Sequence, residues 1–166
     1  MTSEDSNTSE DNSVQPSGEV DDVLGPPPEQ FDPAAIPTKI LETVLLRFLA
    51  RVIHADGEIH PKEMTMLMEV ALKLELNGAE ARQILDDEFS KNSDCEQLAA
   101  QIPDRERRRE AYAMGCLMCC ADGDADDRER DVLNAFAKGA EIPEEDAASI
   151  FDEVLKASKQ AQAARA

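Results

Sequence analysis

The chain has 166 residues and carries 17 Lys and Arg against 36 Asp and Glu, a net charge of −19 at pH 7. This balance argues against nucleic acids and anionic lipids as partners, because both require clustered basic charge. The length suits one folded domain. An aromatic content of 4%, with no Trp, indicates an aliphatic core and favours an all-α fold.

Residues 1–34 are predicted to form a disordered acidic tail. The first 32 residues contain nine Asp and Glu and no Lys or Arg, and they offer too little apolar surface to offset the entropy of ordering them. No basic segment leads into an apolar run at the start, so no secretory signal is expected. The longest nearly apolar stretch, residues 111–121, is about half the length that a membrane span needs. We therefore expect a cytoplasmic protein with reduced thiols.

Apolar residues recur at helical spacing from Pro37 onward. The expected helices begin, in chain order, after Pro37, at Pro61, at Ala79, at Asp94, at Pro103-Asp104, near Asp127 and near Pro143. Asn77-Gly78 is expected to end the second helix, and Ser93 is expected to cap the fourth. The second half of the fifth helix is apolar all round, which predicts a buried centre. The seventh helix is expected to fade into the polar, Ala-rich residues 156–166.

The second half of the chain repeats the first at an offset of 66 residues. Ala55-Asp56-Gly57-Glu58 aligns with Ala121-Asp122-Gly123-Asp124, and no gap is needed for about the next 35 residues. Each copy reads as helix, acidic turn, helix, short turn and helix. Because one copy is too small to bury its own apolar faces, we expect about seven helices in one pseudo-two-fold domain over residues 35–160.

An apolar helix that runs into an A-D-G motif followed by Glu, given twice, resembles the tellurite-resistance TerB family. The module is also similar to the N-terminal domain of DjlA-type co-chaperones, although the chain has no J-domain signature and differs in its long acidic tail. The motif positions are Asp56, Gly57 and Glu63, then Asp122, Gly123 and Glu129. The resemblance implies acidic residues gathered on one surface, divalent-metal binding and a cytoplasmic stress response. It further implies partners among tellurite-resistance and membrane-bound stress proteins, and no enzymatic activity.

The acidic turns have two interpretations. In the first, carboxylates hold a hard cation, Ca²⁺ or Mg²⁺, which prefers oxygen ligands. The candidate metal ligands are Asp56, Glu58, Glu63, Asp122, Asp124, Asp126 and Glu129. The loop is not an EF-hand, since the twelfth position counted from Asp122 is Leu133. In the second interpretation the same residues start helices, with Asp126 and Glu129 as a capping box and the two glycines supplying positive φ.

Three other groups have a sharper and a plainer interpretation. Cys116, Cys119 and Cys120 share a helix face; they are a thiol cluster for soft metal or tellurite, or, as we favour, small buried side chains. His54 and His60 are either metal ligands or solvated. The basic run from Arg105 to Arg109 is a solvated first turn or a docking site for an acidic segment such as the tail. The methionines at helical spacing belong mainly to the core.

The sequence therefore predicts a non-enzymatic TerB-like module in tellurite resistance or stress response. It would present an acidic surface, which is a candidate site for a divalent cation, to protein partners, with no nucleic-acid binding and no membrane insertion. The alternative is a structural adaptor without metal, whose acidic turns only cap helices. No catalytic residue is expected, because the chain has no nucleophile elbow and no glycine-rich phosphate loop.

Overall fold

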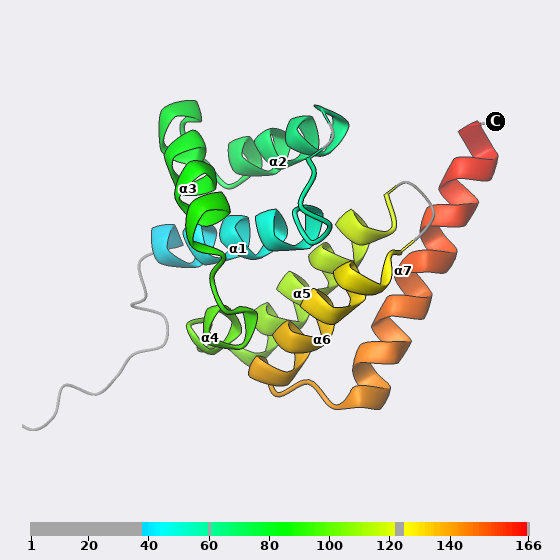
Figure 1. Ribbon diagram of the computed structural model, residues 1–166. Helices are drawn as coiled ribbons and strands as arrows, with labels where there is room; N and C mark the ends of the chain where they lie inside the picture. The colour runs from blue at the N-terminus through cyan, green and yellow to red at the C-terminus, as the bar shows by residue number, and fades with distance from the viewer. Residues whose placement is uncertain (1–37, 60, 122–124, 166) are drawn as a thin grey trace, which may run out of the picture. The chain divides into compact units, whose positions relative to one another are not determined.

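A computed structural model describes residues 38–59, 61–121 and 125–165 of the chain. Over these ranges it contains α-helices and no strand, which confirms the predicted all-α class (Figure 1). The helices are α1 (Thr38–Ile53), α2 (Pro61–Lys73), α3 (Gly78–Lys91), α4 (Cys95–Ala100), α5 (Arg105–Cys119), α6 (Asp127–Gly139) and α7 (Glu144–Arg165). All seven belong to one unit, residues 32–166. The predicted acidic tail lies outside the described residues.

The predicted repeat is visible in the helix boundaries. Both ends of α2 and α6, and the first residues of α3 and α7, are 66 residues apart. The turns between them match as well, because Glu75 (φ 57°) and Glu141 (φ 56°) both adopt the left-handed conformation. In each turn the next amide donates back to the helix, from Leu76 to the Ala71 carbonyl and from Ile142 to the Ala137 carbonyl, both at 3.0 Å. These bonds form the same helix C-terminal motif twice.

Two expected helix boundaries are wrong, and competing side chains explain both. Asn77 does not end α2 but caps α3, because its side chain accepts the Glu80 amide at 2.9 Å and Glu80 completes the capping box. Asp94, not Ser93, caps α4 and accepts the Glu96 amide at 2.8 Å. The hydroxyl of Ser93 is already bonded to Glu88, at 2.6 Å, so it does not serve as a cap.

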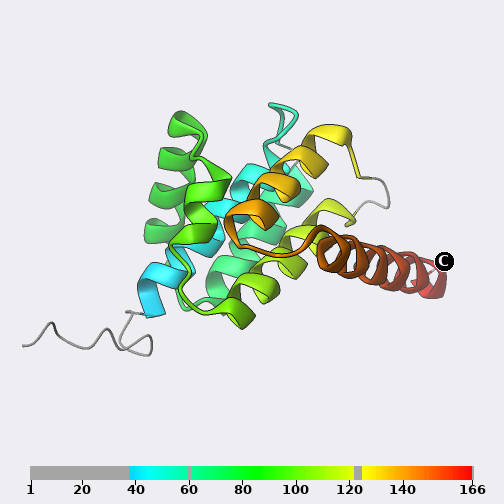
Figure 2. The same ribbon diagram turned by 90° about the horizontal axis from the view of Figure 1, so that it is seen from below.

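The expected fading of the last helix after residue 156 is also wrong. Helix α7 continues to Arg165, consistent with the high helix propensity of its Ala-rich end. Its polar side chains bind the end of α5: the Ser158 hydroxyl donates to the Cys120 carbonyl at 2.8 Å, and the Gln162 amide donates to the Ala121 carbonyl at 3.3 Å. Seen from below, α7 extends away from α1 to α4 (Figure 2).

Helices α1 and α5 meet at the centre of the domain. Helix α1 packs against α2, α3, α4, α5 and α6, and α5 packs against α6 and α7. At the crossing, a Cβ on Gly115 would lie 2.6 Å from the Phe48 ring, so the site has room only for glycine. The Phe48 ring also stacks on Phe136 of α6, with ring centroids 3.7 Å apart. The second half of α5 is largely buried as predicted, except for Leu117, which is 53% exposed.

A second glycine sets the contact between α4 and α6. A Cβ on Gly139 would clash with the backbone oxygen of Glu96. Because that neighbour is main chain and not a flexible side chain, an added methyl group forces the two helices apart. The contact is flanked by an ion pair between Lys138 and Glu96, at 2.8 Å.

We predict that Gly139→Ala destabilises the domain by about 1–3 kcal/mol, the usual cost of overpacking a tight contact. The matched control is Gly78→Ala, where the new Cβ meets nothing within 4 Å and φ is not positive. The control is expected to gain about 0.4–1 kcal/mol, because alanine has a smaller unfolded-state entropy. Urea unfolding followed by circular dichroism measures both, and equal stability of the two variants would contradict the packing described here.

Candidate functional site

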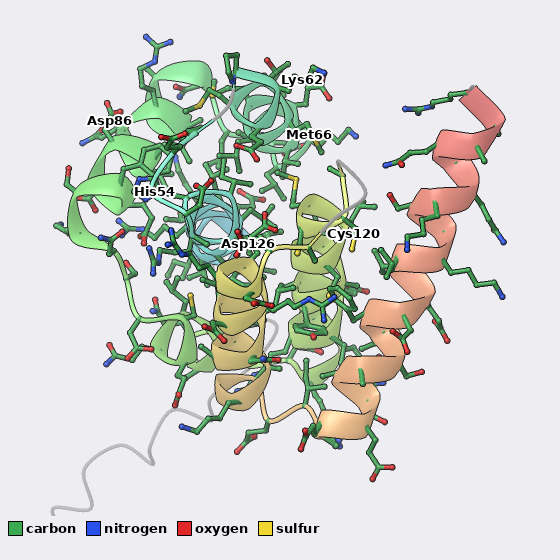
Figure 3. The ribbon with its side chains drawn as sticks, turned by 45° about the vertical axis from the view of Figure 1, so that its right-hand side comes forward. His54, Lys62, Met66, Asp86, Cys120 and Asp126 are labelled. Carbon is green, nitrogen blue, oxygen red and sulfur yellow. The ribbon has the colours of Figure 1, made fainter. Side chains whose placement is uncertain are left out.

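The structure brings the two acidic turns together at one end of the domain. The guanidinium of Arg128, in the first turn of α6, donates to the backbone carbonyl of Asp56 at 3.2 Å. We call residues 54–59 and 125–129 the paired turns. In Figure 3, Asp126 stands at the start of α6, near the end of α1 that carries His54. The alignment at an offset of 66 did not show whether the turns meet, because it gives no information on how the two copies pack.

The first turn is built around Gly57. Its φ of 89° is a left-handed conformation that favours glycine, and its amide donates to the His54 carbonyl at 3.0 Å. A side-chain oxygen of Asp56 accepts the Glu58 amide at 2.9 Å. Asp56 and Glu58 are exposed, whereas Glu63 is partly buried in the first turn of α2. The predicted role of Gly57 in the turn is confirmed.

The second turn contains the predicted capping box. Asp126 accepts the Arg128 amide at 2.8 Å, and Glu129 accepts the Asp126 amide at 2.9 Å. The same Glu129 oxygen is the acceptor for the Cys119 thiol at 3.5 Å. The capping interpretation of this pair is therefore confirmed. Asp122, Gly123 and Asp124 lie outside the described residues.

No metal cluster forms among the described parts of the predicted site. Over residues 38–59, 61–121 and 125–165, no three His, Cys, Asp or Glu side chains are placed to hold a metal ion. Asp56, Glu58, Glu63, Asp126 and Glu129 are thus not gathered into such a group. Since Asp122 and Asp124 are outside the described residues, a cation at the second turn stays a prediction.

The three neighbouring cysteines are buried in α5 and in the residue that caps it. Cys116, Cys119 and Cys120 have no disulfide and are at most 1% exposed. Burial raises the pKa of the Cys116 thiol to about 12 and also raises the pKa of Cys119. A thiolate is the form that attacks or binds soft metals, so these thiols have the character of core side chains, as favoured from the sequence.

The histidine and arginine candidates pack against the domain. The His54 ring lies beside Phe89, with centroids 5.1 Å apart, and is partly buried; His60 is outside the described residues. Two arginines of the basic run form ion pairs with residues that follow α6. Arg109 pairs with Asp146 at 2.8 Å, and Arg108 pairs with Glu141 at 3.2 Å and also donates to the Ile102 carbonyl. Part of this basic run therefore joins α5 to α7 and to the turn before it.

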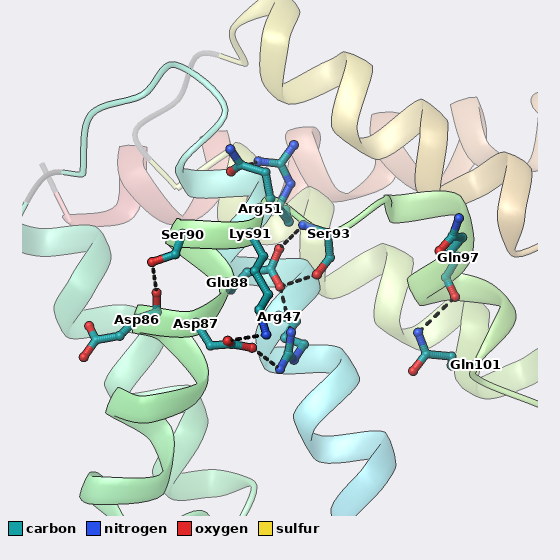
Figure 4. Close-up of polar contacts among 11 residues, drawn as sticks. Arg47, Arg51, Asp86, Asp87, Glu88, Ser90, Lys91, Ser93, Gln97 and Gln101 are labelled. Atoms are coloured by element: carbon teal, nitrogen blue, oxygen red, sulfur yellow. Dashed lines mark hydrogen bonds and ion pairs between the residues drawn. The ribbon is translucent and has the colours of Figure 1, made fainter.

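Glu88 is a buried charge that sequence reasoning missed (Figure 4). It is 0% exposed, and its carboxylate accepts from Arg47 at 3.3 Å and from the Ser93 amide at 2.7 Å. A buried carboxylate needs such compensation, and here it fastens α3 to α1 and to the loop before α4. The repeat contained the signal, because the position 66 residues later is Val154, an apolar residue packed against the core.

We predict that Asp126→Ala destabilises the domain by about 1 kcal/mol, through loss of the cap of α6. The control Asp126→Asn retains an equally good capping side chain but removes the negative charge. It is expected to stay close to the unchanged protein. If both variants lose the same stability in urea unfolding, the carboxylate charge and not the cap is the essential property.

We predict that a thiol reagent at about pH 8 labels the native cysteines far more slowly than the unfolded chain. The reason is burial, which raises the pKa of Cys95 to about 11 and of Cys116 to about 12. Labelling rates with and without guanidinium chloride measure the difference. Rapid native labelling of Cys116, Cys119 or Cys120, identified by mass spectrometry, would show instead a reactive thiol cluster.

None of the described helices combines the length and hydropathy that crossing a bilayer requires. A cytoplasmic location stays a prediction.

A family model described as "Protein of unknown function (DUF533)" matches residues 3–154. No curated protein and no solved structure matches the chain. The match names no tellurite-resistance family, so the TerB-like assignment stays a prediction.

Proposed function

Since the chain belongs to the DUF533 family, whose function is unknown, we propose its function from its geometry. The chain is a non-enzymatic helical module that presents the paired turns to a protein partner. The observation that carries the proposal is the bond from Arg128 to the Asp56 carbonyl, because it joins the acidic turns of both repeats into one surface.

The chemistry of this surface favours a basic partner. Asp56, Glu58, Asp126 and Asp127 are all exposed on the paired turns. Among the described residues, Arg128 brings a positive charge between these carboxylates. Its guanidinium donates a hydrogen bond to the Asp56 carbonyl. A surface whose net charge is negative steers a positively charged partner and raises its association rate. We therefore propose that the partner contributes Lys or Arg side chains.

The cellular role proposed for this module is stress or tellurite resistance in the cytoplasm. It is supported by the resemblance of the doubled A-D-G motif to the TerB family. Under this proposal the partners are other tellurite-resistance proteins or membrane-bound stress proteins.

We propose that the module acts without metal. Asp126 and Glu129 already use side-chain oxygens to bind backbone amides, and Arg128 brings a positive charge between the turns. Both features lower the benefit of a cation there. The second candidate is Ca²⁺ or Mg²⁺ held by Asp122, Asp124, Asp126 and Glu129, which the density of carboxylates in this turn supports.

A metal titration separates the two candidates. A ligand that binds only the folded state raises the melting temperature as its concentration grows. We predict no such rise with Ca²⁺, Mg²⁺, Mn²⁺ or Zn²⁺. A rise that disappears in Asp124→Asn with Asp126→Asn, a pair that retains the cap, would establish the metal form.

Partner binding is tested with charge-matched variants in affinity capture from the native cell. The test variant combines Asp56→Asn, Glu58→Gln and Asp127→Asn in the paired turns. The control combines Glu69→Gln, Asp86→Asn and Glu153→Gln, which are exposed positions elsewhere. We expect a partner that the unchanged protein and the control capture, that the test variant loses, and that salt weakens. A partner retained by the test variant would contradict the proposal.

A further inference from the structure

A groove runs between α6 and α7 above α5, with a volume of about 610 Å³. Its floor is mainly apolar, with Leu133 and Ala137 on α6, Ala147 on α7, and Ile142 in the turn between these helices. Tyr112 of α5 closes the bottom, where its hydroxyl donates to the Ala147 carbonyl at 3.4 Å. Figure 3 shows α5, α6 and α7 together on this side of the domain.

The corresponding seam of the first repeat is lined by different side chains. Helices α2 and α3, the counterparts of α6 and α7, pack against each other. On the wall of α6, the groove is lined by Arg130, Asn134 and Lys138. The residues 66 positions earlier are Met64, Met68 and Leu72. Met64 and Met68 pack against the core, whereas Leu72 is 66% exposed. The wall on α6 is thus polar where its counterpart in the first repeat is apolar.

The aromatic residue in this seam shows the same difference. Phe151 lines the groove and is only partly buried, whereas its counterpart Leu85 is 2% exposed. The floor residues are at most 8% exposed, so Phe151 and the charged walls are the part of this seam that a partner can still cover.

The two walls of the groove carry opposite charges. Arg130 and Lys138 stand on α6, and Glu144 and Asp152 stand on α7, at matching eight-residue spacings. Among the described residues no ion pair joins the two walls. Lys138 pairs with Glu96 of α4 at 2.8 Å, and the Arg130 guanidinium lies over the Phe151 ring, 4.9 Å from its centroid. The acidic wall is thus left without a cation.

We propose that this groove binds an amphipathic α-helix of another protein. The apolar stripe of that helix, with residues at i, i+3, i+4 and i+7, rests on the floor. Its acidic edge faces Arg130 and Lys138, and its basic edge faces Glu144 and Asp152. The eight-residue spacing of each wall corresponds to about 12 Å, or two turns of the bound helix. This inference goes beyond the proposed function, because the groove shares no lining residue with the paired turns.

The test uses a fluorescent synthetic helical peptide of about 14 residues, long enough for the two-turn groove. It carries Leu on the stripe, Glu along one edge and Lys along the other. The control peptide has the same composition, with Glu and Lys alternating along both edges. The first peptide is expected to bind about tenfold more tightly in fluorescence anisotropy, because only it matches both walls.

Variants of the protein locate the binding. Ala148→Trp fills the groove from an exposed position and is expected to weaken binding at least about tenfold. Its control is Ala157→Trp, an exposed position on the same helix outside the groove lining. Arg130→Gln is expected to reduce the preference between the peptides, whereas Arg82→Gln on α3 is not. Melting temperatures verify that each variant is folded.

Three results would overturn the proposal. One is no binding of either peptide at about 1 mM, which corresponds to negligible affinity. Another is equal affinity of the two peptides, or binding that Ala148→Trp leaves unchanged. The third is a dimer in sedimentation that Ala148→Trp abolishes, since a second copy would then fill the groove. The paired-turn variant Asp56→Asn, Glu58→Gln and Asp127→Asn should retain its affinity for the peptide. Peptide binding in the groove and partner capture by the paired turns can therefore fail independently of each other.

Discussion

The close crossing of α1 and α5 at Gly115 is the constraint on which the rest of the domain depends. The Phe48 ring occupies the space that a Cβ on Gly115 would need, and it stacks on Phe136. Three helices from both repeats therefore meet at one aromatic pair. This packing holds α6 against α1, and the first turn of α6 carries Arg128, which bonds to Asp56. Core packing and the bond from Arg128 together hold the paired turns next to each other.

The two repeats share a backbone but have diverged in side chains. Their turns have the same left-handed residue, Glu75 in one and Glu141 in the other. Their second and third helices differ at the seam, where Met64 and Met68 of the first repeat correspond to Arg130 and Asn134 of the second. Two copies together bury a shared core that one copy is too small to form, and their side chains differ at this seam.

The sequence predicts what depends on local pattern. Helical periodicity gives the class, the 66-residue offset gives the matching helices, and the Asp126 and Glu129 spacing gives a capping box that the structure contains. Local pattern fails where a side chain already has another hydrogen-bond partner. Ser93 is a good capping residue by type, but its hydroxyl binds the buried Glu88, so Asp94 caps α4 instead.

The paired turns and the groove could not be predicted from the sequence, because both depend on how helices far apart in the chain pack together. The contact of the two acidic turns rests on one long-range bond from Arg128. The groove depends on how far α7 stands from α6, which no periodicity encodes. Even so, the repeat contained a signal that could have been used: polar Arg130, Asn134 and Lys138 replace an apolar seam.

A double-mutant cycle on Gly115→Ala and Phe48→Leu tests the central claim most directly. If the Phe48 ring fills the space above Gly115, the smaller leucine relieves the clash of the new methyl group. The double variant should then be more stable than the sum of the single losses predicts, with a coupling of about 0.5–3 kcal/mol. Additive losses in urea unfolding would contradict the account, because they would mean that the two residues do not share this space.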